Sequence, residues 1–268
     1  MIQDIFPKIF NNQYIVKEVK DNDFIVQFEN NTILLNIDNS FIKYNQIKDK
    51  EIKLYYLFSI DNKNVFLTNS IKNSNFKNIE IRELRYFNNN WVSFVGITAY
   101  QINNWLIDNK YCGRCASLMN HSINERALIC NNCNNIIYPK INPAVIVLIK
   151  DGDRAVLTKY KRGSGRYALV AGFCEIGETV EETVKREVLE EVGLKVKNIK
   201  YYKSQPWSFT DSLLLGFVCD LNGDDTITVD EIELSEARWL YREEIPEFQN
   251  NTSLTQELIS AFKNNKIS

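Results

Sequence analysis

The 268-residue sequence contains no uninterrupted apolar run of about 18 residues, so no segment is expected to span a membrane. Its first residues, Met-Ile-Gln-Asp-Ile-Phe, lack the basic region and apolar stretch of a secretory signal, which favours the cytoplasm. No long Lys/Arg block is present and the net charge is −2, so a broad surface that follows nucleic-acid phosphates is not favoured. The composition, 44% hydrophobic and 25% charged, is typical of a globular protein.

The chain has no internal repeat or low-complexity linker, and it divides into three segments by pattern. Residues 1–107 are predicted to form a small β-rich domain, because short apolar runs alternate with Asn and Asp. Its strands are expected at residues 13–17, 23–28, 32–37, 55–60 and 64–68, followed by a helix over residues 91–107. Residues 108–141 contain most of the cysteines, and residues 142–268 form the last segment.

The last segment combines buried strands with helices. Strands are expected at residues 144–149, 154–158 and 213–219. A helix is expected over residues 179–192, with Gly193 as its stop signal, and another over residues 253–263. Strands before and after a central helix predict an α/β layered domain.

Six cysteines are present, and four form two Cys-x-x-Cys knuckles, at Cys112, Cys115, Cys130 and Cys133. Thiolates two residues apart can bind one tetrahedral ion, and four of them close its coordination shell. In a cytosolic protein this spacing favours a metal over disulfides, so one structural Zn²⁺ per chain is predicted. The alternative is four ordinary buried cysteines. His121 is expected to be a loop residue, and Cys174 and Cys219 are expected to pack as small apolar residues.

The most specific pattern is a set of glutamates within residues 172–194. A helix places Glu187, Glu190 and Glu191 at positions i, i+3 and i+4, so that all three share one face. Crowded carboxylates repel unless divalent cations bind them, and oxygen ligands suit Mg²⁺ or Mn²⁺. The alternative is a solvated acidic helix.

Other residues of the same pattern are expected to support this face. Arg186 has Glu182 and Glu190 one helical turn away on either side, so it can hold the glutamates in register. Gly172 and Gly177 would let the preceding loop turn sharply and bring backbone oxygens near the metal ions.

Residues 172–194 resemble the Nudix box, with every specified position filled. The resemblance implies an α/β/α sandwich fold, preceded here by the four-cysteine ribbon and the β-rich domain. It also implies catalysis by metal-bound water attacking a pyrophosphate, with Glu191 or Glu190 as the general base and Arg186 in a supporting role. The implied ligands of the divalent ions are Glu187, Glu190, Glu191, the backbone carbonyl of Ala171 and a downstream carboxylate. Glu233 matches that carboxylate, with Glu231 and Glu236 as rivals.

A four-cysteine ribbon before a Nudix box is similar to the NADH pyrophosphatase branch of the Nudix hydrolases, and the resemblance covers roughly residues 75–268. That branch carries a Ser-Gln-Pro-Trp-Pro-Phe-Pro-x-Ser motif, which this chain matches except that Ser208 and Thr210 replace two prolines. Losing a proline frees the local φ angle, so affinity or specificity is expected to change. The resemblance implies a set of substrate-contacting residues: Arg82, Glu125, Tyr138, Gln205, Pro206, Trp207, Ser208, Phe209, Thr210, Asp211, Ser212 and Thr255. For Trp207 and Phe209 the alternative is a role as core aromatics.

The resemblance thus implies hydrolysis of NAD(H) to NMN(H) and AMP, and it extends to removal of NAD caps from RNA. It also implies a homodimer that the N-terminal domain supports. A second hypothesis keeps the enzyme but changes the substrate to ADP-ribose or a diadenosine polyphosphate. A third is a zinc-ribbon binding module without catalysis, which the intact box carboxylates oppose.

Overall fold

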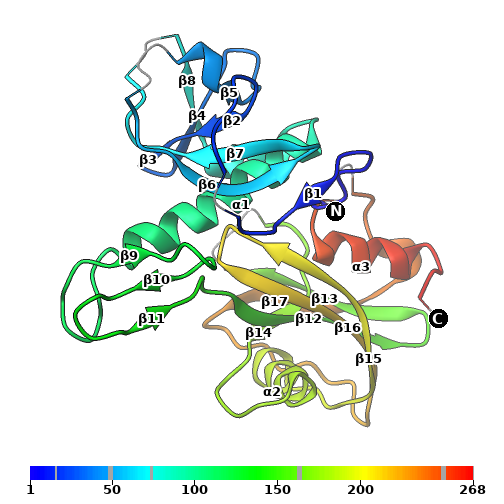
Figure 1. The fold of residues 1–268 in the computed structure, drawn as a ribbon. Helices are drawn as coiled ribbons and strands as arrows, with labels where there is room; N and C mark the ends of the chain where they lie inside the picture. The colour runs from blue at the N-terminus through cyan, green and yellow to red at the C-terminus, as the bar shows by residue number, and fades with distance from the viewer. Residues whose placement is uncertain (16, 48–50, 73–74, 162–164, 249–251, 268) are drawn as a thin grey trace. The chain divides into compact units, whose positions relative to one another are not determined.

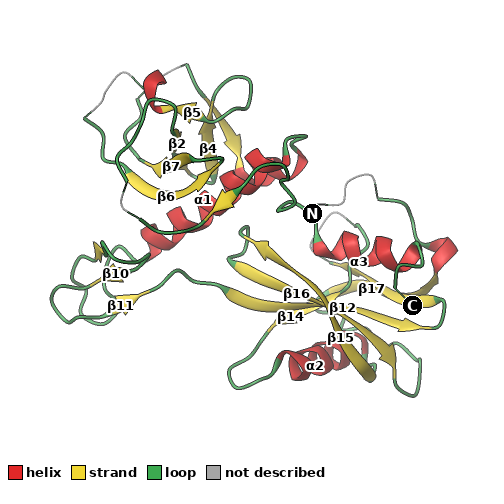
Figure 2. Cartoon of the chain, turned by 45° about the vertical axis from the view of Figure 1, so that its right-hand side comes forward, coloured by secondary structure: helices red, strands yellow, loops and turns green. Residues whose placement is uncertain are grey.

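The computed structural model describes residues 1–15, 17–47, 51–72, 75–161, 165–248 and 252–267. The chain forms two compact units (Figures 1 and 2). The C-terminal unit comprises Met1 with residues 141–207 and 212–268, and the N-terminal unit comprises residues 2–140 with the turn 208–211. Among the described residues, no helix has both the length and the apolar character that a membrane crossing needs.

The C-terminal unit is built on one six-stranded mixed sheet. Its strands run in the order β15 (Val196–Trp207), β16 (Ser212–Leu221), β12 (Asn142–Asp151), β13 (Arg154–Tyr160) and β17 (Leu234–Tyr241), and β14 (Val170–Phe173) pairs with β12. Strand β12 is parallel to β16 and antiparallel to β14. Central strand β12 has neighbouring strands on both edges, and it reads as a continuous apolar run because both of its faces are buried.

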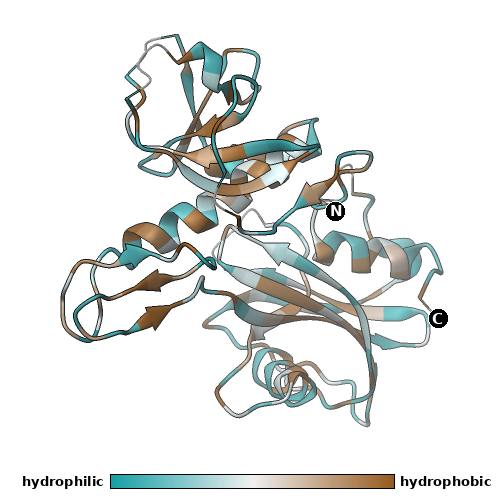
Figure 3. Ribbon diagram, viewed as in Figure 1, coloured by the Kyte–Doolittle hydropathy of each residue, from teal (hydrophilic) through white to brown (hydrophobic). Residues whose placement is uncertain are grey.

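Two helices, α2 (Val180–Val192) and α3 (Leu254–Lys263), cover opposite faces of this sheet (Figure 1). Successive side chains of a strand point to opposite faces, and the core of β12 follows that rule. Val145 and Val147 pack in a cluster with Val188 of α2. Ile146 packs in a separate cluster with Leu258 of α3. The expected α/β/α sandwich is confirmed, and Figure 3 shows the hydrophobic colour concentrated on its central strands.

Helix α2 begins and ends where its sequence predicts. The Thr179 hydroxyl accepts from the backbone N–H of Glu182, while the Glu182 carboxylate accepts from the backbone N–H of Thr179, which makes a reciprocal capping box. Gly193 follows with φ 71°, the left-handed conformation that glycine adopts at low cost and that ends helices.

The N-terminal unit contains three small sheets and a long helix. One sheet has the order β1 (Phe10–Asn11), β6 (Tyr55–Ile60), β7 (Lys63–Leu67), β2 (Phe24–Val26) and β5 (Ile42–Lys43). A second joins β3 (Phe28–Glu29), β4 (Thr32–Leu35) and β8 (Lys77–Glu80), and the third joins β11 (Ile136–Ile137), β10 (Leu128–Ile129) and β9 (Asn120–His121). Helix α1 spans Asn90–Asp108, and short 3₁₀ helices occupy Tyr44–Gln46 and Ile81–Tyr86 here and Arg242–Glu244 in the C-terminal unit.

Two expectations for this unit are wrong. Residues 13–15 and 17 are not in a strand, and Val16 lies outside the described residues. Tyr14 is instead held by its side chain, because its hydroxyl donates to the backbone oxygen of Ser122. His121 is not a loop residue: it lies in β9, and its ring stacks on Tyr55 at 4.4 Å between centroids.

Candidate metal and substrate sites

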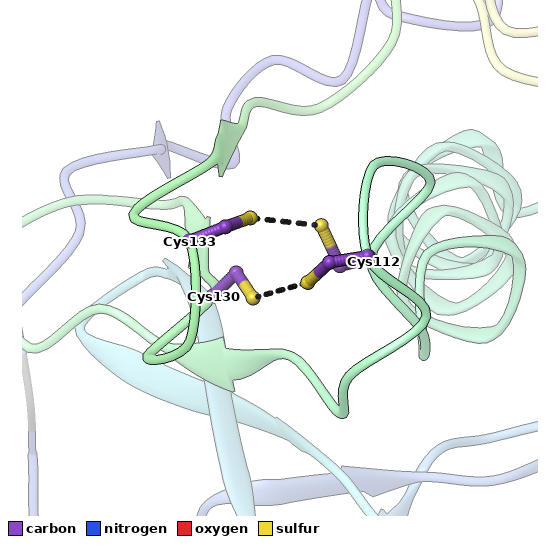
Figure 4. Close-up of side chains that lie close together, drawn as sticks. Cys112, Cys130 and Cys133 are labelled. Carbon is purple, nitrogen blue, oxygen red and sulfur yellow. Dashed lines mark hydrogen bonds between the residues drawn. The ribbon is translucent and has the colours of Figure 1, made fainter.

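The four knuckle cysteines converge on one point in the N-terminal unit. All four sulfurs lie within 4.8 Å of one another, with Cys112 to Cys133 at 3.6 Å and Cys115 to Cys130 at 3.4 Å. Figure 4 shows the labelled thiols pointing toward a common centre. Zn–S bonds of about 2.3 Å in a tetrahedron separate sulfurs by about 3.8 Å, so this donor set fits a closed Zn²⁺ site.

The two knuckles use the same turn. The backbone N–H of Ala116 donates to the carbonyl of Cys112, and that of Asn134 donates to the carbonyl of Cys130. Both donors adopt positive φ, 60° at Ala116 and 56° at Asn134. Each knuckle is thus a local unit, which explains why spacing alone identifies it.

In the C-terminal unit, the predicted glutamates of α2 lie in three different environments. Glu191 is buried, with 2% of its surface exposed. The Glu187 side chain is 13% exposed, whereas that of Glu190 is 59% exposed. The helix face therefore leads from solvent at Glu190 into the fold at Glu191.

Glu191 has one partnered and one unpartnered carboxylate oxygen. Its Oε1 accepts from the backbone N–H of Ala171 at 3.2 Å, while its buried Oε2 has no hydrogen-bond partner among the described residues. Burial raises the pKa of Glu191 to about 8, and the charges of Glu187, Glu233 and Asp230 act in the same direction. A buried acceptor without a partner is costly, and a divalent cation would supply one. The residues present therefore fit a Mg²⁺ or Mn²⁺ ion.

The carboxylate oxygens of these glutamates do not lie as close together as the ligands of one metal ion would. Within the described residues, the cysteine quartet is the one group of three or more His, Cys, Asp or Glu residues whose ligand atoms lie within 4.8 Å of one another. The structure thus places Glu191 against the backbone of Ala171, and Glu187 beside Arg186.

Arg186 is the centre of the charge network. Its guanidinium makes a bidentate pair with Glu178, at 2.6 and 2.9 Å, and it donates to Glu187 at 2.6 Å and to Glu190 at 3.1 Å. It also donates to the backbone oxygen of Phe173 at 3.0 Å, which ties the loop to the helix.

The expectation that Glu182 supports Arg186 in this network is wrong. Its carboxylate is used in the capping box of α2, and Glu178, eight residues before Arg186, takes its place. Hydrogen bonding from Arg186 lowers the pKa of Glu178 to about 2. The role of Glu178 was missed because helical spacing relates only residues three or four apart.

The two loop glycines have different roles. Gly177 has φ +90°, which requires glycine for a sharp turn, as expected. A Cβ at Gly172 would lie 2.0 Å from the carboxylate carbon of Glu187. Gly172 is therefore needed because Glu187 packs directly on the loop backbone.

The three candidate downstream carboxylates, Glu231, Glu233 and Glu236, have different described surroundings. The charge of Glu233 acts on both Glu187 and Glu191. Glu236 instead forms an ion pair with Lys159 at 2.7 Å. For Glu231 the described contact is its backbone oxygen, which accepts from the Lys161 ammonium.

Tyr160 is a further member of this neighbourhood that the sequence did not indicate. Burial raises its pKa, and the charges of Glu191, Glu233 and Glu187 raise it further. Its hydroxyl donates to the backbone oxygen of Leu169 at 3.3 Å. Tyr160 stays a neutral phenol, and it holds the strand that leads to Ala171.

The Gln-Pro-Trp motif ends strand β15 and forms the turn before β16. Gln205 is fully buried: its amide accepts from the backbone N–H of Leu254 at 2.7 Å and donates to the oxygen of Thr252 at 3.0 Å. This side chain braces the start of α3, where Thr255 occupies the first turn. Pro206 is exposed and Trp207 is half-buried.

The turn itself, residues 208–211, groups with the N-terminal unit. Ser208 is buried and Thr210 is exposed, so the two proline replacements lie in different surroundings. The ring of Phe209 lies 5.6 Å from the guanidinium of Arg85. Asp211 adopts φ 53°, and Ser212 is buried at the start of β16.

The remaining predicted substrate residues lie in the N-terminal unit. The Tyr138 hydroxyl donates to Glu125 at 3.2 Å, so the structure brings this pair together. Arg82 is exposed in the 3₁₀ helix Ile81–Tyr86. The predicted residues thus fall into two sets, one in each unit.

Two known domain families match consecutive segments of this chain. The NUDIX domain family matches residues 140–261, and the NADH pyrophosphatase zinc ribbon domain family matches residues 107–138. The C-terminal unit is thus a NUDIX domain, the class that its sandwich and carboxylate helix define. With the ribbon in front of it, the chain is similar to the NADH pyrophosphatase branch of the Nudix proteins.

Relatives with curated names match the same part of the chain. A protein of Pseudomonas syringae pv. tomato named NAD-capped RNA hydrolase NudC is 40% identical over 166 residues, 61% of this chain and 59% of the relative. A protein of Haemophilus influenzae with the same name is 37% identical over 166 residues, 60% of this chain and 62% of the relative. A solved NUDIX hydrolase from Nitrosomonas europaea has a TM-score of 0.49 at 23% identity, over 59% of this chain and 92% of its own. The matched part spans less than two thirds of the curated relatives.

Proposed function

We propose that this protein is a metal-dependent pyrophosphohydrolase that cleaves NAD(H) to NMN(H) and AMP, and that it also removes NAD caps from RNA. The observation that carries the proposal is the buried, unpartnered Oε2 of Glu191, placed beside Glu187 and within reach of the charge of Glu233. A cluster of carboxylates with a buried, unpartnered oxygen suits a cation. The relatives named NAD-capped RNA hydrolase support the choice of substrate.

The roles of the side chains follow from their positions. Glu187, Glu190, Glu191 and Glu233, with the carbonyl of Ala171, would hold the divalent ions. When bound, such ions screen the phosphate oxygens, acidify a water molecule and stabilise the leaving phosphate. Glu191 or Glu190 would accept the proton of the attacking water. Arg186 would keep the glutamates aligned through Glu178 and the loop oxygen of Phe173.

Binding of the nucleotide is assigned to the predicted substrate-contacting residues. Trp207 and Phe209 offer aromatic surface for a base, and Tyr138 with Glu125 offers a hydrogen-bonding pair. Gln205 would act by fixing the turn before α3, because its described hydrogen bonds go to Thr252 and Leu254.

A substrate panel tests the proposal. Purified protein with Mn²⁺ would be given NADH, NAD⁺, NAD-capped RNA, ADP-ribose and a diadenosine polyphosphate, and kcat/KM would be compared. The proposal expects NMNH and AMP from NADH, with NADH or NAD⁺ ahead of the last two compounds. Turnover of ADP-ribose or the diadenosine compound without turnover of NAD(H) would refute the substrate, and the absence of any turnover would favour a binding module.

We further propose a cytoplasmic homodimer with three segments: residues 1–107, residues 108–141 and residues 142–268. The family resemblance supports the dimer and its support by the N-terminal segment. Light scattering on the purified chain would measure the mass, and a monomer over the working concentration range would refute this part.

A further inference from the structure

The N-terminal unit contains a cavity of about 190 Å³ whose walls combine aromatic and aliphatic side chains. The rings come from sheet strands, helix α1, the ribbon and the irregular segment that contains Tyr14: Tyr14, Tyr55, Tyr56, Phe66, Trp105 and His121. The Tyr55 and His121 rings are stacked 4.4 Å apart with 21° between their planes. Such a wall presents π-faces to any flat ring that enters.

The same cavity is positively charged. Arg126 and Lys17 line it, and its described lining residues include neither Asp nor Glu. The Arg126 guanidinium donates to backbone oxygens of Asn12 and Leu57 and to the side-chain oxygen of Asn12, all of them uncharged acceptors. The Lys17 ammonium donates to the uncharged amide of Asn64 at 3.1 Å.

The Arg126 guanidinium is half-buried and lies 5.7 Å from the centre of the Tyr14 ring, whereas Lys17 is exposed. Among the ion pairs of the described residues, none involves Arg126 or Lys17. Burial lowers the pKa of Arg126, because a desolvated cation is less stable than a solvated one. A buried cation is usually paired, so an anion that is not part of the protein would complete this site.

Unused hydrogen-bond donors point the same way. Trp105 is 6% exposed, and its indole N–H has no partner within the described structure. Arg126 donates three hydrogen bonds to described residues, which leaves two of its five N–H groups for a further acceptor. Lys17 has further ammonium protons beyond the one given to Asn64. The cavity is therefore rich in donors, which suits a phosphate rather than a neutral ligand.

The size of the cavity limits the ligand. Pockets for drug-sized molecules measure about 300–1,000 Å³, and this cavity, at about 190 Å³, is smaller. It is too small to enclose a dinucleotide, and a mononucleotide bound there would lie partly in its open mouth.

We propose that this cavity is a second ligand site that binds a nucleoside monophosphate, with the base against the aromatic wall and the phosphate toward Arg126 and Lys17. The site lies wholly within the N-terminal unit, whereas the carboxylate helix belongs to the C-terminal unit. It goes beyond the proposed hydrolysis and does not depend on it.

Calorimetric titration of the full chain with AMP, without added divalent ion, tests this site. Lys17→Gln removes an exposed cation and keeps a polar side chain. Lys63→Gln is the matched control, because Lys63 is also an exposed lysine over an aromatic ring, that of Phe24, but does not line the cavity. His121→Ala provides a second variant, and Glu187→Gln reports on binding at the carboxylate helix.

The proposal expects AMP to bind at least tenfold more tightly than adenosine or inorganic phosphate, because ring and phosphate are both recognised. Lys17→Gln and His121→Ala should each weaken AMP about tenfold, the loss expected for one charge-assisted contact or one stacked ring. Lys63→Gln and Glu187→Gln should change it less than twofold. Absence of AMP binding at millimolar concentration would overturn the proposal. So would binding that Glu187→Gln abolishes and Lys17→Gln leaves intact, or binding of a 5′-phosphorylated RNA oligonucleotide but not AMP.

Discussion

The cysteine quartet and the glutamate cluster are both built for metal ions, yet they are assembled differently. The four sulfurs already lie within 4.8 Å of one another, at spacings close to those of a zinc tetrahedron. Among the described residues the glutamates do not reach such spacing: Arg186 donates to Glu187 and Glu190, and Glu191 is buried.

The difference reflects what each site has to do. A closed shell of four thiolates leaves no position for substrate, so its ion can only stabilise the ribbon. The glutamate cluster leaves a buried oxygen of Glu191 without a partner and keeps Glu190 at the surface. Such a site can gain its ion together with a phosphate, as magnesium sites with substrate phosphates do.

The largest expected effect on activity comes from a substitution in the glutamate cluster that leaves the cysteine quartet intact. Glu191→Gln should lower kcat by about three orders of magnitude, since a ligand and a candidate base are both lost. Steady-state kinetics with NADH and Mn²⁺ measures the loss. Glu181→Gln, at an exposed position in the first turn of the same helix, is the control and should remain active. An active Glu191→Gln enzyme would show that the box is not the catalytic centre, and zinc content should stay at one per chain in both.

Gly172→Ala should have the next largest effect, because the new Cβ would overlap the Glu187 carboxylate at 2.0 Å. Displacing that ligand by about 1 Å is expected to cost on the order of 100-fold in kcat. Gly113→Ala is the counterpart in the first cysteine knuckle, where a Cβ meets nothing within 4 Å. Equal kinetics for the two variants would refute the packing role of Gly172.

Loss of a cysteine ligand should act on stability more than on chemistry. Cys115→Ser is expected to release zinc and to lower the thermal midpoint, because metal binding provides folding energy to a small ribbon. Zinc analysis and thermal unfolding measure both effects. Cys174→Ser changes a half-buried cysteine outside the quartet and should keep the metal. If Cys115→Ser retained zinc at one per chain, the closed tetrahedral site would be contradicted.

The smallest effect is a pH dependence that only the glutamate cluster should show. The pKa of Glu191 rises from 4.5 to about 8 on folding, so the folded chain binds an extra proton between these values. Without divalent ions, the free energy of unfolding should therefore fall as pH increases from about 5 to 8. Denaturant titrations across this range measure the slope. Glu191→Gln should flatten it, and Mn²⁺ should stabilise the wild type more at pH 8 than at pH 6. A slope unchanged by Glu191→Gln would assign it to another group.

Local patterns explain what the sequence could predict. The bounds of α2, its glycine stop and the cysteine knuckles all depend on residues within a few positions of one another. The continuous apolar run of β12 likewise identified a buried strand. These features therefore needed no knowledge of the rest of the chain.

Contacts between distant residues were not predictable in this way. Helical spacing suggested Glu182 as the partner of Arg186, but the N-terminal cap of α2 uses Glu182. Tyr160 approaches Glu191 only because β13 lies in the same sheet as β14. Gln205 meets the start of α3 across 49 residues of sequence.

Cleavage of NADH in ¹⁸O-labelled water with Mn²⁺ tests the central claim most directly. Mass spectrometry of the products would identify both the bond that breaks and the phosphorus that water attacks. Attack on one phosphorus of the pyrophosphate predicts NMNH and AMP in equal amounts, with one ¹⁸O in one of them and none in the other. Release of nicotinamide, or recovery of intact NADH under conditions where zinc is bound and the protein is folded, would contradict the account.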